Sequence, residues 1–224
     1  QKFSDDPATF MLIDRSTRGK TETILFNIDI EGSINKDKTA VLRVFAKMFY
    51  THLGFFGENL KVAMLEQYID QLGKTEEFRR AFEAKKGKPW TEQRKAFAFN
   101  GKFIVPTLME VLDMSEEDAK RWFNDKTAVE FSIAQLVEDI KNYVNKQPDS
   151  FRLLFMIDEV GQYVGTDTDM LLNLQSLTEK IGSECGGKVW VMCTGQEAID
   201  EIIKVRADEF SRIQARFKTR LSLS

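Results

Sequence analysis

Two hydrophobic periods occur along this chain, and they predict two kinds of element. Three short runs of apolar and β-branched residues predict strands at 22–30, 151–157 and 188–193. The last two runs are almost continuously apolar, which is typical of parallel strands whose sheet is covered on both faces. We therefore predict an α/β fold in which the three strands pair as a parallel sheet flanked by helices.

Apolar residues at helical spacing predict helices outside these strands. One helix is expected to end at Gly54, and its apolar face consists of Val41, Val44, Phe45, Met48, Phe49 and Leu53. Another is expected over residues 169–181, with Gly182 as its cap. The first 21 residues are expected to be irregular apart from a short apolar run.

Residues 58–130 show only helical patterns, in short pieces at 59–72, 75–85 and 91–100. Capping boxes predict two helix starts, one at Ser115 within this region and one at Ser132 just after it. We therefore predict one domain over residues 1–224 with a helical insertion at 58–130.

The predicted strand at 151–157 ends in two adjacent carboxylates, Asp158 and Glu159. In P-loop ATPases this arrangement is the Walker B motif. Its first acid holds the Mg²⁺ that bridges the nucleotide phosphates, and its second aligns the attacking water. We assign Asp158 as the metal and cofactor ligand and Glu159 as the catalytic acid. An Asp-Glu pair can also simply end a core strand.

The phosphate-binding pattern G-x-x-x-x-G-K-[ST] does not occur in the sequence. Its nearest approach is Gly19-Lys20-Thr21, but Asp14 stands where the first glycine is required. A predicted strand follows, whereas a phosphate loop must open a helix. We therefore reject Lys20 as a phosphate ligand. Either the protein has no phosphate loop, or the chain begins after it; Gln rather than Met at residue 1 favours the second alternative, in which the chain is part of a larger protein.

Polar residues also follow the next predicted strand, where such ATPases place a residue that senses the γ-phosphate. Thr194 and Gln196 are the candidates. A Thr-Gly pair is equally a good turn.

Arg212 and Arg216 lie four residues apart in a region with a helical pattern, so they share a helix face. A permanently charged, planar guanidinium suits an arginine finger that reaches a neighbouring subunit's phosphates. For either arginine alone, a solvated basic face is the simpler interpretation. Arg212 and Arg216 follow Asp158, Glu159 and Thr194 along the chain. Taken together in this order, these residues favour the arginine-finger interpretation over a solvated basic face.

Composition narrows the classes of protein further. The net charge of −3 gives no general attraction to nucleic acid or to an anionic membrane. One histidine and two cysteines argue against a metal cluster. No stretch approaches the apolar length of a membrane span, and reduced thiols fit a cytoplasmic protein.

Four stretches carry a resemblance to the P-loop ATPases of BREX phage-defence systems, the BrxC/PglY family. They are 23–32 (TILFNIDIEG), 155–163 (FMIDEVGQY), 194–198 (TGQEA) and 212–217 (RIQARF). The resemblance covers essentially the whole chain. It implies a large cytoplasmic ATPase of the AAA+ or a related class, with ATP and Mg²⁺ as cofactors. The implied partners are other BREX components, further copies of itself and possibly DNA, but no membrane.

A different function is suggested by residues 74–102, where basic residues outnumber acidic ones and aromatic residues are interleaved. The aromatic residues are Phe78, Phe82, Trp90, Phe97 and Phe99. Such a mixture could follow a phosphate backbone and stack bases, as in a non-catalytic DNA-binding or scaffolding module on an ATPase-like frame. Near-helical spacing favours a core stripe with a solvated basic face instead.

The final strand pattern, at 217–223, is expected to lack its natural neighbour, because the resemblance places the strand before the phosphate loop in the middle of the sheet. Unpaired strand edges are costly. We therefore expect 217–223 to be displaced, disordered or paired with another molecule.

Overall fold

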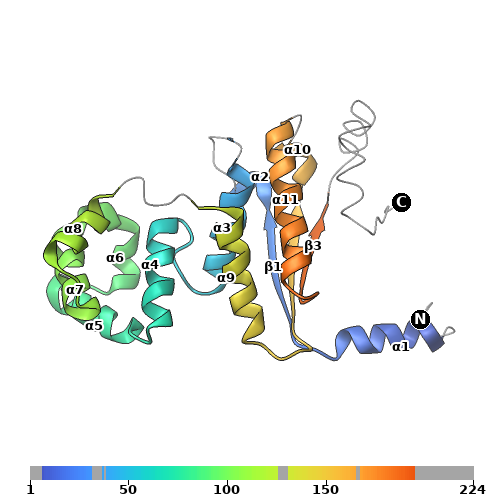
Figure 1. The fold of residues 1–224 in the computed structure, drawn as a ribbon, viewed down its shortest axis with the longest axis horizontal. Helices are drawn as coiled ribbons and strands as arrows, with labels where there is room; N and C mark the ends of the chain where they lie inside the picture. Colours follow the sequence, from blue (N-terminus) through green and yellow to red (C-terminus); the bar gives the residue numbers. More distant parts are fainter. Residues whose placement is uncertain (1–6, 32–36, 38, 126–130, 165–166, 195–224) are drawn as a thin grey trace. The chain divides into compact units, whose positions relative to one another are not determined.

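The computed structural model describes residues 7–31, 37, 39–125, 131–164 and 167–194, and it divides into two units (Figure 1). Unit 1 comprises residues 1–44 and 132–224, and unit 2 comprises residues 45–131. The described elements of unit 1 are α1 (Pro7–Thr17), β1 (Thr21–Asn27), α2 (Ile28–Glu31), α9 (Ile133–Asn145), β2 (Arg152–Asp158), α10 (Val160–Val164), α11 (Thr168–Glu184) and β3 (Val189–Cys193). Helix α3 (Ala40–His52) begins in unit 1 and continues into unit 2.

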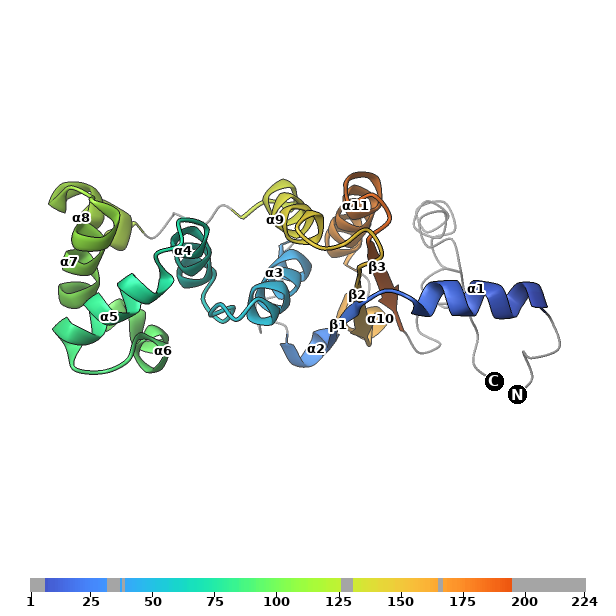
Figure 2. The same ribbon diagram turned by 90° about the horizontal axis from the view of Figure 1, so that it is seen from below.

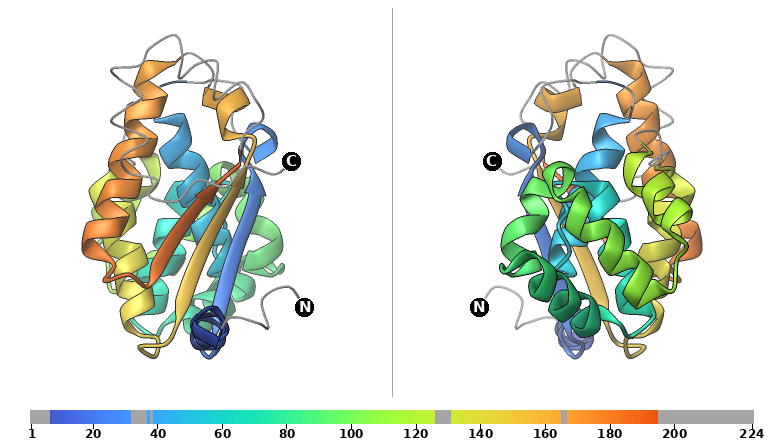
Figure 3. Two further views of the ribbon diagram at one scale, coloured as in Figure 1. Left: turned by 90° about the vertical axis from the view of Figure 1, so that its right-hand side faces the viewer. Right: turned by 90° about the vertical axis from the view of Figure 1, so that its left-hand side faces the viewer.

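The three predicted strands pair as a parallel sheet in unit 1, and their order is β1-β2-β3 (Figure 3). The α/β class is therefore confirmed. The first strand ends earlier than predicted, at Asn27 rather than at residue 30, because the chain turns there into α2. The Asn27 side chain favours this turn, since its Oδ1 accepts a hydrogen bond from Asp29 N at 2.9 Å.

One face of the sheet is covered by α9 and α11, which lie side by side (Figure 2). Both connections between strands advance in the same direction across the sheet, and right-handed crossovers place the connecting helices on one face. The strand side chains under these helices are buried: Ile24, Phe26, Leu153, Phe155, Ile157 and Val189. Tyr143 of α9 also donates a hydrogen bond to Glu22 of β1.

The other face corrects a prediction. The apolar runs of β2 and β3 predicted a sheet covered on both sides, but Leu25, Trp190 and Met192 on this face are exposed in the described part of the chain. A strand's periodicity reports which side chains are apolar, and it does not report which segment covers them.

Two helix predictions are also wrong. Residues 7–17, expected to be irregular, form α1. Gly182 does not cap the helix after β2, because α11 continues to Glu184. The apolar positions Leu177, Ile181 and Cys185 keep the helical spacing and are buried, so the helix passes through Gly182. The chain turns instead at two glycines of positive φ, Gly186 and Gly187.

Unit 2 is helical throughout its described residues, and the predicted insertion 58–130 lies within it. Its helices after α3 are α4 (Leu60–Gln71), α5 (Thr75–Lys86), α6 (Trp90–Gln93), the 3-10 helix η1 (Arg94–Phe99), α7 (Gly101–Leu112) and α8 (Glu116–Asn124). The single helix predicted at 91–100 is instead α6 followed by η1, and the backbone also kinks at Ala96 within η1. Helix α7, which contains Pro106, was not predicted.

The predicted serine caps are confirmed. Ser115 begins α8 and accepts a hydrogen bond from Asp118 N, and Ser132 begins α9 and accepts one from Gln135 N. Side-chain oxygens satisfy otherwise unpaired amides in the first turn of a helix. These two boundaries are local, so the sequence alone could locate them.

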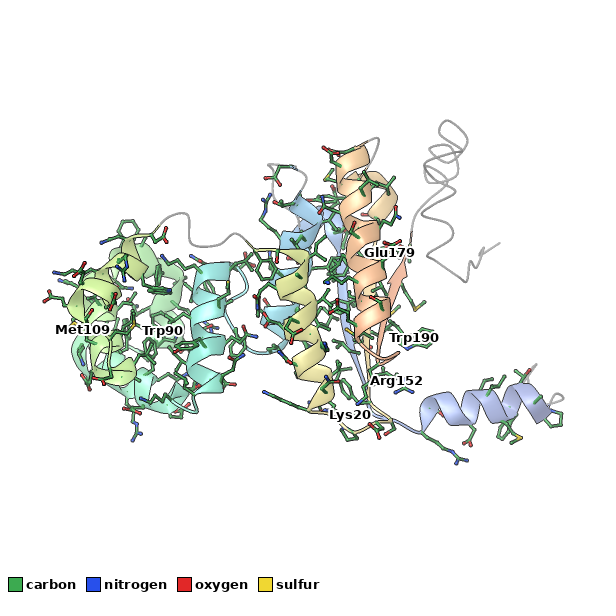
Figure 4. All side chains as sticks on the ribbon, viewed as in Figure 1. Lys20, Trp90, Met109, Arg152, Glu179 and Trp190 are labelled. Carbon is green, nitrogen blue, oxygen red and sulfur yellow. The ribbon has the colours of Figure 1, made fainter. Side chains whose placement is uncertain are left out.

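The core of unit 2 surrounds Trp90, which is 2% exposed and lies in the interior (Figure 4). Its ring contacts Phe78 and Phe82 edge to face, with centroids 5.1 Å away in both cases. Its Nε1 donates a hydrogen bond of 2.6 Å to the buried Glu66 carboxylate. The same carboxylate accepts from Phe56 N and forms an ion pair with Arg94. This network gives the Glu66 carboxylate three donors, whereas the buried Nε of Arg94 has no hydrogen-bond partner among the described residues.

Candidate functional site

Three parallel strands bring polar side chains together at the carboxyl edge of the sheet in unit 1. The strand register pairs Asn27, the last residue of β1, with Asp158, the last residue of β2. It also pairs Ile157 with Cys193, so Thr194 follows β3 level with Asp158. Residues paired across parallel strands point to the same side. Asn27, Asp158 and Thr194 therefore form one row, with Glu159 directly beside it.

Hydrogen bonds connect the predicted acid and the predicted sensor. The Thr194 hydroxyl donates to Asp158 Oδ1, which also accepts from Glu159 N at 3.0 Å. Backbone bonds hold Thr194 in place, since its N–H donates to Ile157 O at 2.9 Å and its carbonyl accepts from Val160 N at 3.2 Å. The structure thus brings Asp158, Glu159 and Thr194 together. Asp158 and Thr194 are both exposed to solvent.

Glu159 adopts a backbone conformation that is unusual for its residue type. Its φ is 60°, in the left-handed region that favours glycine. The carboxylate accepts a hydrogen bond of 2.5 Å from Asn27 Nδ2, across 132 residues of sequence. Non-glycine residues in this region cost roughly 1–3 kcal/mol, and they are enriched at functional sites. The strain turns the chain sharply from β2 into α10 and directs the Glu159 side chain toward β1.

Asn27 is the site residue that sequence reasoning missed. It lies inside the run predicted as a strand to residue 30, so its position at the edge of the sheet was hidden. A short polar side chain two residues before Asp29 was the available signal, because Asn commonly bonds the backbone two residues on and ends a strand.

A second polar group lies near the site, at the start of α3. Asp37 accepts hydrogen bonds from Arg43 and Thr39, which together lower the pKa of its carboxyl to about 2. Tyr163 of α10 is buried, and burial raises the pKa of its hydroxyl above the usual value. The charges of Arg43, Asp29 and Asp37 also act on Tyr163. The start of α3 is therefore close to the helix that follows Glu159.

Three of the predicted site residues, Gln196, Arg212 and Arg216, lie outside the described residues, as does the predicted strand 217–223. Lys20 precedes β1 at the amino edge of the sheet, where it pairs with Glu22 (Figure 4). The 7 residues of β1 span roughly 20 Å at about 3.3 Å per residue. Lys20 therefore lies far from Asp158, which agrees with its rejection as a phosphate ligand.

The donors at this edge suit a magnesium ion that is held mainly by a nucleotide. Across the described ranges, no three His, Cys, Asp or Glu side chains gather into a metal site. Asp158 supplies one exposed carboxylate, and Thr194 supplies a hydroxyl. Mg²⁺ in nucleotide sites keeps several waters and takes one or two protein carboxylates together with phosphate oxygens. The residues present therefore fit Mg²⁺ bound with a nucleotide better than a dedicated metal cage.

The aromatic residues of 74–102 are mostly unavailable to a nucleic acid. Phe78, Phe82, Trp90 and Phe97 are buried in the core of unit 2, whereas Phe99 is 87% exposed. Base stacking requires exposed ring faces. The interleaved pattern in the sequence is thus largely a core stripe.

Comparison with known proteins does not assign the chain to a family. No family model matches the chain, and no solved structure gives a significant match. Within the described residues, no helix is both long and apolar enough to cross a membrane.

Proposed function

We propose that the carboxyl edge of this sheet is the Walker B and sensor part of an ATP-hydrolysing site in a P-loop ATPase of the AAA+ or a related class. One observation carries the proposal. Asn27, Asp158, Glu159 and Thr194 converge at the ends of three adjacent parallel strands and are joined by hydrogen bonds. Ligands of open α/β sheets bind at the carboxyl ends of the strands.

Each residue has a role that its contacts support. Asp158 would be the protein carboxylate on Mg²⁺, which when bound would neutralise charge on the phosphates. Thr194 donates its hydroxyl hydrogen to Asp158 and would sense the γ-phosphate. Glu159 would align the attacking water and accept its proton. Asn27 donates to one oxygen of the Glu159 carboxylate in the structure, and a carboxylate can accept further hydrogen bonds, so Glu159 could hold the water while Asn27 orients the carboxylate.

The proposal requires a phosphate-binding loop that residues 1–224 do not supply, since their sequence has no such motif. It also includes an arginine finger, for which Arg212 and Arg216 are the candidates. Such a finger acts between subunits, so the proposal implies a homo-oligomer. The four stretches that resemble BREX ATPases support a cytoplasmic role in phage defence, together with other BREX components and with direct or indirect action on DNA.

The test is ATP turnover by the whole protein with Glu159→Gln. Removing the group that accepts the proton should lower the rate by about 10²–10⁴-fold while nucleotide still binds. Glu138→Gln, an exposed change on α9, is the matched control and should leave turnover unchanged. Turnover retained by Glu159→Gln would remove Glu159 from the mechanism.

A second experiment examines action between subunits. Arg212→Ala or Arg216→Ala should lower turnover by about 10³-fold or more with nucleotide binding almost intact, because a finger stabilises charge that develops in the transition state. Mixing the arginine variant with the Glu159→Gln variant should restore part of the activity, since mixed interfaces then contain one complete site. Failure to restore activity at every mixing ratio would contradict a shared site.

A third measurement concerns residues 1–224 alone, which should bind ATP only weakly because the sequence offers no phosphate loop. Calorimetry measures this directly. Micromolar affinity would show that another part of this chain holds the phosphates.

A further inference from the structure

Unit 2 has a short surface that combines lysines without a carboxylate partner and an exposed aromatic ring. Residues 85–102 contain six basic residues and one acidic residue. Two of the basic residues are paired with acids outside this range, Lys85 with Glu110 and Arg94 with Glu66. The other four, which form no ion pair with another described residue, are Lys86, Lys88, Lys95 and Lys102. Within the described part of the chain, no carboxylate in contact neutralises these four charges.

Two of these lysines meet at one aromatic ring. Lys86 Nζ lies 4.6 Å from the centroid of Phe103, and Lys102 Nζ lies 4.9 Å from it. The two ammonium groups are therefore within roughly 10 Å of each other, about one Debye length at 0.1 M salt, so their fields add. Lys102 lies in the first turn of α7, where the helix dipole opposes a cation. The stability of α7 therefore does not explain this lysine, whereas attraction of an anion does.

Phe99 is the exposed aromatic residue of this surface. Its side chain is 87% exposed, the largest value among the large apolar residues of the described chain. Phe97, two residues earlier in η1, is buried and contacts the rings of Trp122 and Phe123. These contacts anchor the segment, while Phe99 stays outside the core. Lys102 follows Phe99 by three residues, so their Cα atoms are within about 11 Å of each other. An exposed ring thus lies close to an unpaired lysine.

We propose that this surface binds a single strand of nucleic acid. It consists of Lys86, Lys88, Lys95, Phe99 and Lys102. The lysines contact phosphates and Phe99 stacks on an unpaired base, which is how proteins hold single strands without reading their sequence. A duplex fits less well, because its bases already stack on each other and leave no face for Phe99. An acidic protein would pair with the lysines but offers no base to the exposed ring.

The net charge of −3 does not oppose this binding, because charges more than about 8 Å away are largely screened at physiological ionic strength. The surface lies within unit 2, whereas the proposed hydrolytic site belongs to the sheet of unit 1. The inference therefore adds a partner to the protein and does not depend on ATP hydrolysis. Since the surface offers one exposed ring and four lysines, we expect binding that is weak and sensitive to salt.

Fluorescence anisotropy of a labelled oligothymidylate of about 15 nucleotides tests the proposal with residues 1–224, starting at about 50 mM salt. The slope of log K against log salt should reach about −3, since each phosphate contact to a single strand contributes about −0.7. Lys86→Gln combined with Lys102→Gln should make this slope shallower by about 1.4. Phe99→Ala should weaken binding by about tenfold with the slope unchanged, because a stacked ring carries no charge.

Matched controls remove the same groups elsewhere. Phe10→Ala on α1, where Phe10 is 60% exposed, should leave binding unchanged. Lys120→Gln on α8 combined with Lys146→Gln at the end of α9 should also leave both the affinity and the salt slope unchanged. Circular dichroism checks that each variant is folded. Glu159→Gln should bind the strand as the unaltered chain does, so failure of this proposal and failure of the proposed hydrolysis are distinguishable.

Other ligands identify the kind of partner. A duplex of the same length should bind more weakly, and Phe99→Ala should not change its affinity. Oligouridylate in place of oligothymidylate shows whether RNA or DNA is preferred, and dependence on Phe99 with either strand supports the proposal. Unchanged affinity in Phe99→Ala, or no binding of either strand at about 50 mM salt, would overturn it. Polyglutamate that binds more tightly than the strand would also overturn it and would identify an acidic protein as the partner.

Discussion

The left-handed conformation of Glu159 makes a prediction that separates backbone strain from side-chain contacts. Glu159→Gly and Glu159→Ala both remove the hydrogen bond from Asn27 Nδ2. They differ in the backbone, because only glycine adopts a φ of 60° without steric cost. Comparing the two variants therefore isolates the cost of the conformation.

The magnitude follows from two opposing effects. A non-glycine residue in the left-handed region costs roughly 1–2 kcal/mol. Glycine in turn loses about 0.5–1 kcal/mol through the greater freedom of the unfolded chain. The conformational cost is the larger effect, so Glu159→Gly should be more stable than Glu159→Ala by about 0.5–1 kcal/mol.

The assay is urea denaturation of residues 1–224 followed by circular dichroism. The same pair of substitutions at Glu138, in the middle of α9, is the matched control. There the order should reverse, with glycine less stable than alanine by about 1 kcal/mol, because the residue is in a regular helix. Equal stability of the two Glu159 variants, or the helical order at both positions, would refute the argument that Glu159 is strained.

Three further predictions concern stability. Glu66→Ala should lower the free energy of unfolding, measured by thermal denaturation, by about 3–5 kcal/mol, because it leaves the Arg94 guanidinium and Trp90 Nε1 without their buried acceptor. A decrease below about 1 kcal/mol would contradict the role of this network. Gly19→Ala should destabilise unit 1 in urea, since its Cβ would come within 1.9 Å of a backbone carbonyl oxygen; unchanged stability would show that the connection before β1 is loose. Burial raises the pKa of the Cys185 thiol from 9.0 to about 11 in the folded protein. As the pH rises, the unfolded chain therefore loses the thiol proton before the folded chain does. The free energy of unfolding should fall between about pH 9 and about pH 11. Cys185→Ala should reduce this slope without abolishing it, because burial also raises the pKa of the Cys193 thiol from 9.0 to about 12. An identical slope in both proteins would exclude the Cys185 thiol as a cause.

Local patterns determined much of the secondary structure in both units. Continuous apolar runs located β2 and β3, and parallel pairing followed from their composition and from the helices between them. Serines before an apolar repeat located the starts of α8 and α9, because a cap is satisfied within one turn. Asp158 and Glu159 were identifiable as a strand-end pair since their neighbours in sequence define the strand.

Contacts between distant segments were decided only by the tertiary structure. The hydrogen bond from Asn27 to Glu159 depends on the register of β1 against β2, and the left-handed turn at Glu159 depends on the anchoring of α10 by Thr194 O. The local hydrophobic pattern of a segment contains no information about its contacts with distant segments. The sequence likewise showed that Trp190 and Met192 belong to an apolar strand, but burial is a property of what packs against a residue. The tertiary structure decided which face of the sheet α9 and α11 cover and which face stays exposed.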